Sequence, residues 1–385
     1  MAVLDYVKEI FTLSRITITL YKYNEVIPKE VDMKKIAIIL AGGNGTRFWP
    51  LSRTSRPKQF QNISGDDTLL NETISRINLF IPMENIYIVA GKNHQSLLEE
   101  TLPTDFVEKN ILLEPMSRNT AGAIAAAVQH INNIHQYATI GIFPADHYIE
   151  DNLAFAEQLS KAYDIAYDTC KMILMGIPVT YPATGYGYLE VDRVDLEIKT
   201  LNRFVEKPNH EMAQKYMEDE HFFWNSGIIV SRANVILKEV MKYMPELYFY
   251  SRQVLYWHQE FESGSLEELY EKFPHTSMDY GVLEKSDQLL MLSLSSGWND
   301  LGSWDALPEI FTSDGHGNIA SHEQMLIDTE NTLVLSDNKF VATIGLKDII
   351  IVETDDSLLI CKKGHSQDIK MLVESLNQQG RIELT

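Results

Sequence analysis

The sequence predicts an α/β fold, with a mostly parallel sheet flanked by helices and a small C-terminal β module. Two observations support this prediction. From residue 36 to about 310, short apolar runs alternate with helical patterns, which is typical of a parallel sheet covered on both faces. After about residue 312, apolar runs recur every eight or nine residues without helical patterns between them, as in an all-β module. We therefore expect domains at 33–312 and 313–385, after an N-terminal extension at 1–32.

The order of the elements follows from the apolar pattern. Strands are predicted at 36–40, 86–90, 111–113, 139–143, 172–176, 227–231 and 290–294. Amphipathic stretches predict helices at 68–80, 120–135, 152–168 and 209–219. Parallel sheets of this kind bind ligands beyond the carboxyl ends of their strands, so the residues that follow each strand are the candidates for a site.

The C-terminal module shows strand patterns that begin near 332, 340, 349 and 358, separated by polar pairs such as Asp337-Asn338. A final helix is predicted over about 365–378. Periodicity alone does not distinguish hairpins from a β-solenoid.

The first 32 residues lack a recognisable motif, and their apolar stretches are too short for a secretory signal. Met33-Lys34-Lys35, followed by the apolar run Ile36–Leu40, resembles a natural chain start. We interpret residues 1–32 as an extension without a catalytic role, arising from a mis-assigned start.

Composition narrows the classes of partner. The chain has 385 residues and a formal net charge of −21, which argues against binding to nucleic acid or to anionic membranes. No apolar run approaches the roughly 20 residues of a membrane-spanning helix. The two cysteines form neither a disulfide framework nor a zinc cluster, so we expect a cytoplasmic protein. A small anionic ligand is compatible with this charge, because such a ligand responds to local charge.

The strongest candidate site follows the first predicted strand, at Ala41-Gly42-Gly43-Asn44-Gly45-Thr46-Arg47. Glycines allow backbone N–H groups to approach phosphate oxygens closely. Residues 42–60 also contain four basic residues and no acidic ones: Arg47, Arg53, Arg56 and Lys58. The loop is not a Walker A motif, because no Gly-Lys-Ser/Thr follows the glycines. It is not a Rossmann fingerprint either, since Phe48 stands where the third glycine of the fingerprint belongs. The alternative is a glycine-rich turn with solvated bases.

Two aspartates also follow predicted strands. Asp146 comes after the strand 139–143, and Asp300 comes after the strand 290–294. Carboxylate oxygens suit Mg²⁺, so the pair could hold one such ion. A helix N-cap is the alternative for Asp146.

The pattern Gly-Gly-x-Gly-Thr-Arg at 42–47, with Pro50-Leu51 and Pro57-Lys58, resembles the signature of the sugar nucleotidyltransferases. The extended form Pro57-Lys58-Gln59-Phe60 is similar to the mannose-1-phosphate guanylyltransferases, and the resemblance covers about residues 34–310. It implies a Rossmann-like nucleotidyltransferase domain that converts GTP and α-D-mannose 1-phosphate to GDP-mannose and pyrophosphate. It also implies Mg²⁺ as cofactor, at Asp146 and Asp300.

The resemblance assigns further roles by position. Arg47, Lys58 and Lys207 are expected to be catalytic. The nucleotide-binding residues would be Ala41, Gly42, Gly43, Gly45, Thr46, Arg118, Asn119 and Thr120. The sugar-phosphate-binding residues would be Gly187, Glu206, Lys207 and Asn225. Asn119 could also cap the helix 120–135. Gly122 replaces the proline usual in this family, so the choice of guanine depends on overall likeness.

Other functions stay open. The first alternative is the same nucleotidyl transfer with another sugar 1-phosphate or another nucleoside triphosphate as substrate. Another is a regulatory subunit that binds a nucleotide sugar without turnover. A glycosyltransferase would commonly contain Asp-x-Asp, which does not occur in this chain. The resemblance also allows a homodimer, and the roughly 70 residues after 315 are too few for the isomerase barrel of some relatives.

Overall fold

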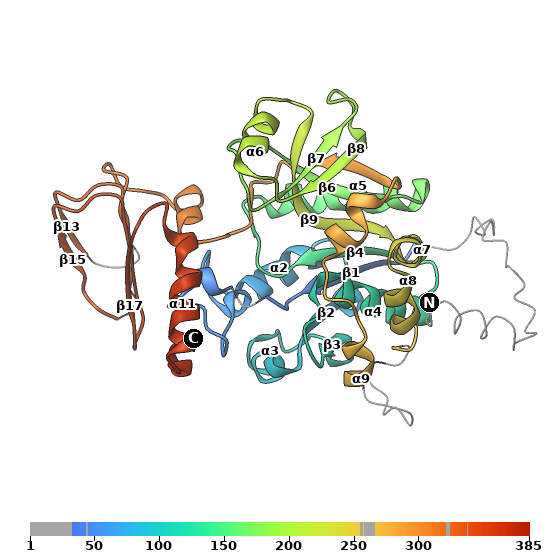
Figure 1. Cartoon of the computed structure of the whole chain (residues 1–385), viewed down its shortest axis with the longest axis horizontal. Coiled ribbons are helices and arrows are strands. Elements are labelled where there is room, and N and C mark those ends of the chain that lie inside the picture. Colours follow the sequence, from blue (N-terminus) through green and yellow to red (C-terminus); the bar gives the residue numbers. More distant parts are fainter. Residues whose placement is uncertain (1–32, 44, 255–256, 258–265, 321–323, 337) are drawn as a thin grey trace, which may run out of the picture. The chain divides into compact units, whose positions relative to one another are not determined.

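The computed structural model describes residues 33–385, except 44, 255–256, 258–265, 321–323 and 337 (Figure 1). The expected extension at 1–32 therefore lies outside the described residues. Residues 34–385 form one compact unit.

The centre of this unit is a sheet in which the described residues form nine strands, in the order β3-β2-β1-β4-β9-β6-β10-β8-β7. The strands are β1 (Lys35–Leu40), β2 (Ile86–Gly91), β3 (Ile111–Glu114), β4 (Thr139–Pro144), β6 (Met172–Pro178), β7 (Gly187–Val191), β8 (Ile198–Glu206), β9 (Phe222–Arg232) and β10 (Leu289–Ser293). All seven predicted strands are present, although β9 begins at Phe222 and not at 227. The predicted fold class is confirmed.

The sheet is mixed in its pairing. Strands β1, β2, β3 and β4 pair in parallel, as do β6 and β10. Strands β8 and β9 run against the other described strands of the sheet, so their pairs are antiparallel. The sequence did not predict β7 and β8. Within β8 only Lys199 and Phe204 are buried, so this strand has no continuous apolar run.

Helices cover both faces of the sheet (Figure 1). The predicted helices correspond to α2 (Leu69–Asn78), α4 (Asn119–Ile134), α5 (Asn152–Thr169) and α6 (His210–Met217). Helices α2, α5 and α6 contribute to one apolar cluster beside the sheet. Helix α4 contributes to a second cluster, together with α7 (Ala233–Tyr243) and α8 (Pro245–Ser251). Shorter helices that the sequence did not predict are α3 (Gln95–Thr101), α9 (Leu266–Glu271) and α10 (Met278–Gly281).

The C-terminal module is a parallel stack. Strands β12 (Ile319–Ala320), β14 (Leu333–Ser336) and β16 (Ile349–Glu353) pair in parallel, as do β13 (Met325–Ile327) and β15 (Ala342–Ile344). Strand β17 (Leu358–Lys362) pairs antiparallel with β16, and α11 (Ile369–Gln378) follows it. Parallel stacking of successive turns is the solenoid arrangement, one of the two alternatives that periodicity left open.

The module shares an apolar cluster with the loop that follows β1. Phe48, Trp49 and Trp304 pack in this cluster with Leu333 and Ile350 of the module. Trp304 Nε1 donates to Trp49 O at 2.9 Å, and Trp49 Nε1 donates to the main-chain oxygen of Leu384 at 2.6 Å. The glycine-rich loop is therefore supported by C-terminal residues. The expected domain limits 33–312 and 313–385 stay predictions.

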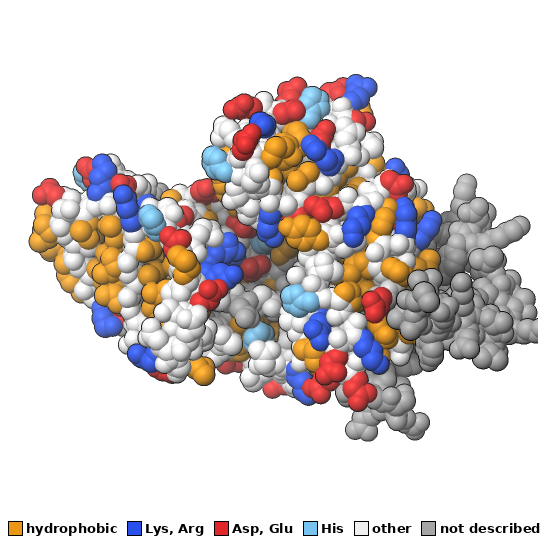
Figure 2. All heavy atoms as spheres, in the orientation of Figure 1, with side chains coloured by type: hydrophobic (Ala, Val, Ile, Leu, Met, Phe, Trp, Pro, Cys, Tyr) orange, Lys and Arg blue, Asp and Glu red, His pale blue; other side chains and the backbone are white. Residues whose placement is uncertain are grey.

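The outer face of the C-terminal module carries hydrophobic side chains (Figure 2). Exposed ones on β13, β15 and β17 are Met325, Ile327, Ile344, Leu358 and Ile360. Across the described residues, no helix combines the length and apolarity needed to cross a bilayer.

Candidate active site

The loop after β1 has a conformation that requires glycine. Gly45 has a φ of 57°, and a β-carbon there would lie 2.3 Å from Lys58 Cβ. Gln59 Nε2 donates to Ala41 O at 2.9 Å and to Gly43 O at 3.0 Å, which fixes the start of the loop against its end. The sequence did not single out Gln59, although it lies within the motif that identified the loop.

Lys58 lies at the centre of the site. Its side chain is 5 % exposed, and Nζ donates to Asp146 Oδ2 at 2.9 Å and to Asp300 O at 2.8 Å. Asp146 follows β4, and Asp300 follows the short strand β11 (Trp298–Asn299). Strand β11 pairs with β5 (Tyr148–Ile149), which brings the two aspartate-bearing segments side by side. The structure thus assembles three residues that the sequence selected in separate motifs.

Both aspartates are held by the surrounding structure. Burial raises the pKa of Asp146, but the Lys58 charge, the neighbouring His147 and the hydrogen bonds to the carboxylate together outweigh this, and the net pKa lies below its usual value. Asp300 Oδ1 accepts hydrogen bonds from the Tyr186 hydroxyl at 2.8 Å and from Gly302 N at 2.9 Å. Asp146 is therefore ionised at neutral pH, and the Asp300 carboxylate has a fixed orientation.

His147 occupies a structural position beside these groups. Its Nδ1 accepts a hydrogen bond from Trp298 Nε1 at 3.1 Å, which links β5 to β11. Burial lowers the pKa of His147, so the imidazole is neutral at pH 7 and available as an acceptor.

The donor set is suited to a cation that obtains further ligands from its substrate. Among the described residues, no three or more His, Cys, Asp or Glu side chains gather as a protein-only metal site. Two carboxylates from Asp146 and Asp300 supply hard oxygen ligands, and Mg²⁺ is commonly bound by one or two carboxylates together with substrate phosphates and water. The residues present therefore fit Mg²⁺.

The other basic residues of the loop do not converge on Lys58. Arg47 Nη1 donates to Gln367 Oε1 at 3.1 Å, in a helical turn of the C-terminal module. Arg53 pairs with Asp356 at 2.7 Å, and Arg56 pairs with Glu100 at 3.0 Å. Only Lys58 among these four cations contacts both aspartate-bearing segments.

A second cluster contains the predicted sugar-phosphate residues. Lys207 Nζ donates to Glu206 Oε1 at 2.7 Å, and a β-carbon at Gly187 would lie 2.7 Å from Glu206 Oε2. Asn225 Nδ2 donates to Asp279 Oδ1 at 3.4 Å. Burial, assisted by Glu206, raises the pKa of Asp279 to about 6. The sequence missed Asp279, which belongs to the short helix α10 and has no apolar pattern around it.

Tyr186 connects the two clusters. Its carbonyl accepts from Lys207 N at 3.2 Å, while its hydroxyl donates to Asp300 Oδ1 at 2.8 Å. The ring packs edge-on against Trp224 and Trp298, at centroid distances of 5.2 and 5.5 Å. Tyr186 lies directly before Gly187. Gly187 is the first residue of β7, so it belongs to the strand and not to the tip of the loop before it.

The predicted nucleotide residues near α4 engage the protein itself. Arg118 Nε donates to Tyr270 O at 2.7 Å, and Thr120 Oγ1 accepts from Met278 N at 2.9 Å. Asn119 begins α4 with a φ of 63°, and its Oδ1 accepts from Thr120 N at 2.8 Å. None of these described contacts brings Arg118, Asn119 or Thr120 to Lys58.

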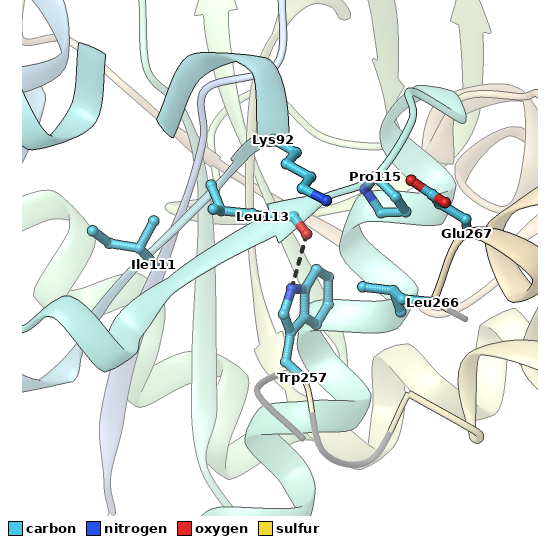
Figure 3. Close-up of a pocket in the computed structure, with 7 residues that line it drawn as sticks. All are labelled: Lys92, Ile111, Leu113, Pro115, Trp257, Leu266 and Glu267. Carbon is cyan, nitrogen blue, oxygen red and sulfur yellow. Dashed lines mark hydrogen bonds between the residues drawn. The ribbon is translucent and has the colours of Figure 1, made fainter. Parts of the chain in front are cut away.

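A cavity of about 330 Å³ lies along β3 (Figure 3). Trp257 Nε1 donates to Leu113 O at 3.1 Å on its wall. Its lining residues are Lys92, Ile111, Leu113, Pro115, Trp257, Leu266 and Glu267. Lys58, Asp146 and Asp300 do not line it, so it is separate from the lysine–aspartate cluster.

Two family models match this chain, one over the part that contains the large sheet and one over the C-terminal module. Residues 36–316 match the family model described as nucleotidyl transferase. Residues 322–376 match the model described as a MannoseP isomerase/GMP-like beta-helix domain, in agreement with the parallel stack of strands.

Named relatives match over most of the chain. The alginate biosynthesis protein AlgA of Pseudomonas aeruginosa is 37 % identical, over 90 % of this chain and 73 % of its own length. Mannose-1-phosphate guanylyltransferase 2 of Escherichia coli O157:H7 is 35 % identical, over 91 % of this chain and 75 % of its own. A crystal structure titled mannose-1-phosphate geranyltransferase, from Thermus thermophilus, is 29 % identical with a TM-score of 0.82, covering 90 % of this chain and all of that one.

Proposed function

The chain belongs to the nucleotidyl transferase family, as a homologue of mannose-1-phosphate guanylyltransferases, and we propose that it converts GTP and α-D-mannose 1-phosphate to GDP-mannose and pyrophosphate. The observation that supports this activity best is the convergence of Lys58, Asp146 and Asp300. A buried cation between two strand-end aspartates suits a reaction in which several phosphate groups meet.

The chemistry requires positioning and charge neutralisation. An oxygen of the sugar phosphate attacks the α-phosphorus of GTP, a new P–O bond forms, and the bond to the β-phosphate oxygen breaks. The sugar phosphate is already ionised, so no general base is needed. Lys58 would neutralise charge on the triphosphate and on the leaving pyrophosphate, and its burial strengthens that interaction.

Asp146 and Asp300 are the proposed Mg²⁺ ligands. When bound there, the ion would supply positive charge beside the phosphates. The hydrogen bonds from Tyr186 and Gly302 to Asp300 Oδ1 would hold this carboxylate in place before the substrates arrive.

The second cluster is proposed to bind mannose 1-phosphate. Lys207 would pair with its phosphate as a point charge, while Glu206 and Asn225 would bond to sugar hydroxyls. Gly187 leaves room for the Glu206 carboxylate, since a side chain there would collide with it.

The glycine-rich loop is proposed to bind GTP through the backbone of Ala41, Gly42, Gly43, Gly45 and Thr46. Arg47 would contact the triphosphate once released from Gln367. Contacts from Arg118, Asn119 and Thr120 stay predictions, as do a homodimer and a cytoplasmic location.

A panel of substrates tests the proposed function. Pyrophosphate release is measured with GTP, ATP, UTP and CTP, each with mannose 1-phosphate or glucose 1-phosphate. GTP with mannose 1-phosphate should give the highest kcat/KM. Preference for another pair would support the same chemistry on different substrates. Binding of GDP-mannose without turnover of any pair would support the regulatory-subunit alternative.

A further inference from the structure

Arg53 is a basic residue of the loop after β1, and the proposed function leaves it without a role. Its side chain is only 12 % exposed, so Arg53 is not a solvated surface charge. Its Nε donates to Pro50 O at 2.7 Å, and its guanidinium carbon lies 5.5 Å from the centroid of the Trp49 ring. Both contacts are with the segment that directly follows the glycines of the loop.

The same guanidinium group binds the C-terminal module. Arg53 Nη2 donates to Asp356 Oδ1 at 2.7 Å and to Ser357 Oγ at 3.2 Å. These partners belong to the turn between β16 and β17, in which Thr354 N donates to Ser357 O at 2.9 Å. One planar group therefore joins this turn to the loop, a task that suits the several fixed donors of a guanidinium.

Arg53 also belongs to a closed turn of the main chain that leads to Lys58. Arg53 N donates to Arg56 O and Arg56 N donates to Arg53 O, both at 3.1 Å. Lys58 follows two residues after this turn, and Gly45 lies against it, because a β-carbon on Gly45 would lie 2.3 Å from Lys58 Cβ. A displacement of Arg53 would therefore reach both Lys58 and the glycines through a short, hydrogen-bonded segment.

Other side chains of the loop contact C-terminal residues as well. Trp49 Nε1 donates to Leu384 O at 2.6 Å, and Arg47 Nη1 donates to Gln367 Oε1 at 3.1 Å in an exposed hydrogen bond. The exposed position of its hydrogen bond allows Arg47 to leave for a ligand. Arg53 is largely buried between the loop and the module, so it is the arginine that stays in place as a support.

We propose that Arg53 is a positioning residue of the triphosphate site, and that Asp356 and Ser357 of the C-terminal module hold the phosphate-binding loop through it. A loop that is ordered before its ligand arrives binds more tightly, because binding then does not have to order it. The module would thereby raise the affinity for GTP without contacting GTP. This assignment rests on the proposed function, because it takes the glycine-rich loop as the GTP site.

Asp356→Ala tests the assignment, because it removes the charged partner of Arg53 from an exposed position of the module. The Kd for GTP, from calorimetry without mannose 1-phosphate, and the KM for GTP should both rise by about three- to tenfold. This range lies between the values for an exposed ion pair and for a buried charged hydrogen bond. The KM for mannose 1-phosphate should stay within about twofold of wild type, since its proposed site is a separate cluster.

The matched control is Asp355→Ala. Asp355 lies in the same turn, but its Oδ1 accepts a hydrogen bond from Asn338 Nδ2 at 3.2 Å, within the module. This variant should keep the wild-type Kd for GTP.

Arg53→Lys separates geometry from charge. Lysine keeps the positive charge but lacks the fork that bonds Pro50 O and Asp356 together, so the Kd for GTP should rise at least as much as in Asp356→Ala. In the double variant the two effects should not multiply, because both changes remove the same contact. Asp356→Glu, which keeps the carboxylate, should stay closer to wild type than Asp356→Ala.

The outcomes separate this proposal from the proposed function. A wild-type Kd for GTP in Asp356→Ala would overturn the role of Arg53, even where urea unfolding shows a loss of stability. Equal rises in both KM values would overturn it as well, since they would indicate a general loss of structure. A wild-type chain that binds GTP but turns over no substrate pair would reject the proposed function, and the comparison of Kd values would still decide the role of Arg53.

Discussion

The Lys58 ammonium group lies 2.9 Å from the Asp146 carboxylate, although 88 positions separate them in the sequence. The same ammonium donates to the main-chain oxygen of Asp300, so one buried cation joins segments that follow three strands. The site therefore depends on contacts between segments that are distant in the sequence.

Replacement of Asp300 by Asn should weaken the response to Mg²⁺, since an amide oxygen is a poorer ligand than a carboxylate. The Mg²⁺ concentration for half-maximal rate should rise by about tenfold. A magnesium titration of GDP-mannose formation measures this, with the exposed Asp287→Asn as control. A titration that coincides with the wild-type curve would remove Asp300 from the proposed metal site.

Replacement of Lys207 by Ala should impair use of mannose 1-phosphate. Loss of one charged contact to a phosphate should raise the KM for mannose 1-phosphate by about 10- to 100-fold, with little change in the KM for GTP. The control is Lys215→Ala, because Lys215 pairs with Glu211 on the surface of α6. Equal effects on both KM values would argue against a specific role in the sugar site.

Arg47 and Arg56 belong to one loop but should differ in importance. Arg47→Ala should lower kcat by at least about 100-fold through loss of charge stabilisation at the triphosphate. Arg56 pairs with exposed Glu100, so Arg56→Ala should stay within about twofold of wild type. Steady-state assays of both variants with saturating GTP compare the two. Comparable losses would show that the charge of the whole loop matters more than the position of Arg47.

Glu114, the last residue of β3, is a buried carboxyl group, and Glu114→Gln should stabilise the fold at neutral pH. The folded pKa of about 8 exceeds the unfolded value of 4.5, so the folded state binds more protons between these values. Stability should therefore fall as pH rises from about 4.5 to 8, by up to about 3 kcal/mol at pH 7.

Urea unfolding at pH 5 and pH 7.5 tests this prediction of stability. The wild-type chain should be less stable at the higher pH, and Glu114→Gln should recover about 1–3 kcal/mol there, with a smaller gain at pH 5. An equal effect of the substitution at both pH values would show that Glu114 does not titrate in this range.

The sequence was sufficient for most of the architecture, because buried strands such as β1 and β4 appear as continuous apolar runs. It was insufficient for β8, whose exposed positions interrupt the pattern, and for Asp279, which lies outside every motif. Motifs also selected Lys58, Asp146 and Asp300, but only the three-dimensional structure shows that they meet. Arg47 illustrates the limit, since its partner Gln367 lies 320 positions away.

The environment of Glu114 likewise depends on which side chains surround it in space, and no local pattern indicates it. A glutamate at the end of a short strand is ordinary in sequence. Its burial and its distance from Gly42 distinguish it from a surface residue.

Lys58→Met tests the central claim most directly, because it removes the cation and keeps much of the apolar stem. GDP-mannose formation from GTP and mannose 1-phosphate is measured at saturating substrates, with Lys161→Met as control, since Lys161 is exposed on α5 and pairs with Glu197. We predict a loss in kcat of about 10²- to 10³-fold for Lys58→Met and none for Lys161→Met. A folded Lys58→Met variant with wild-type turnover would contradict the account.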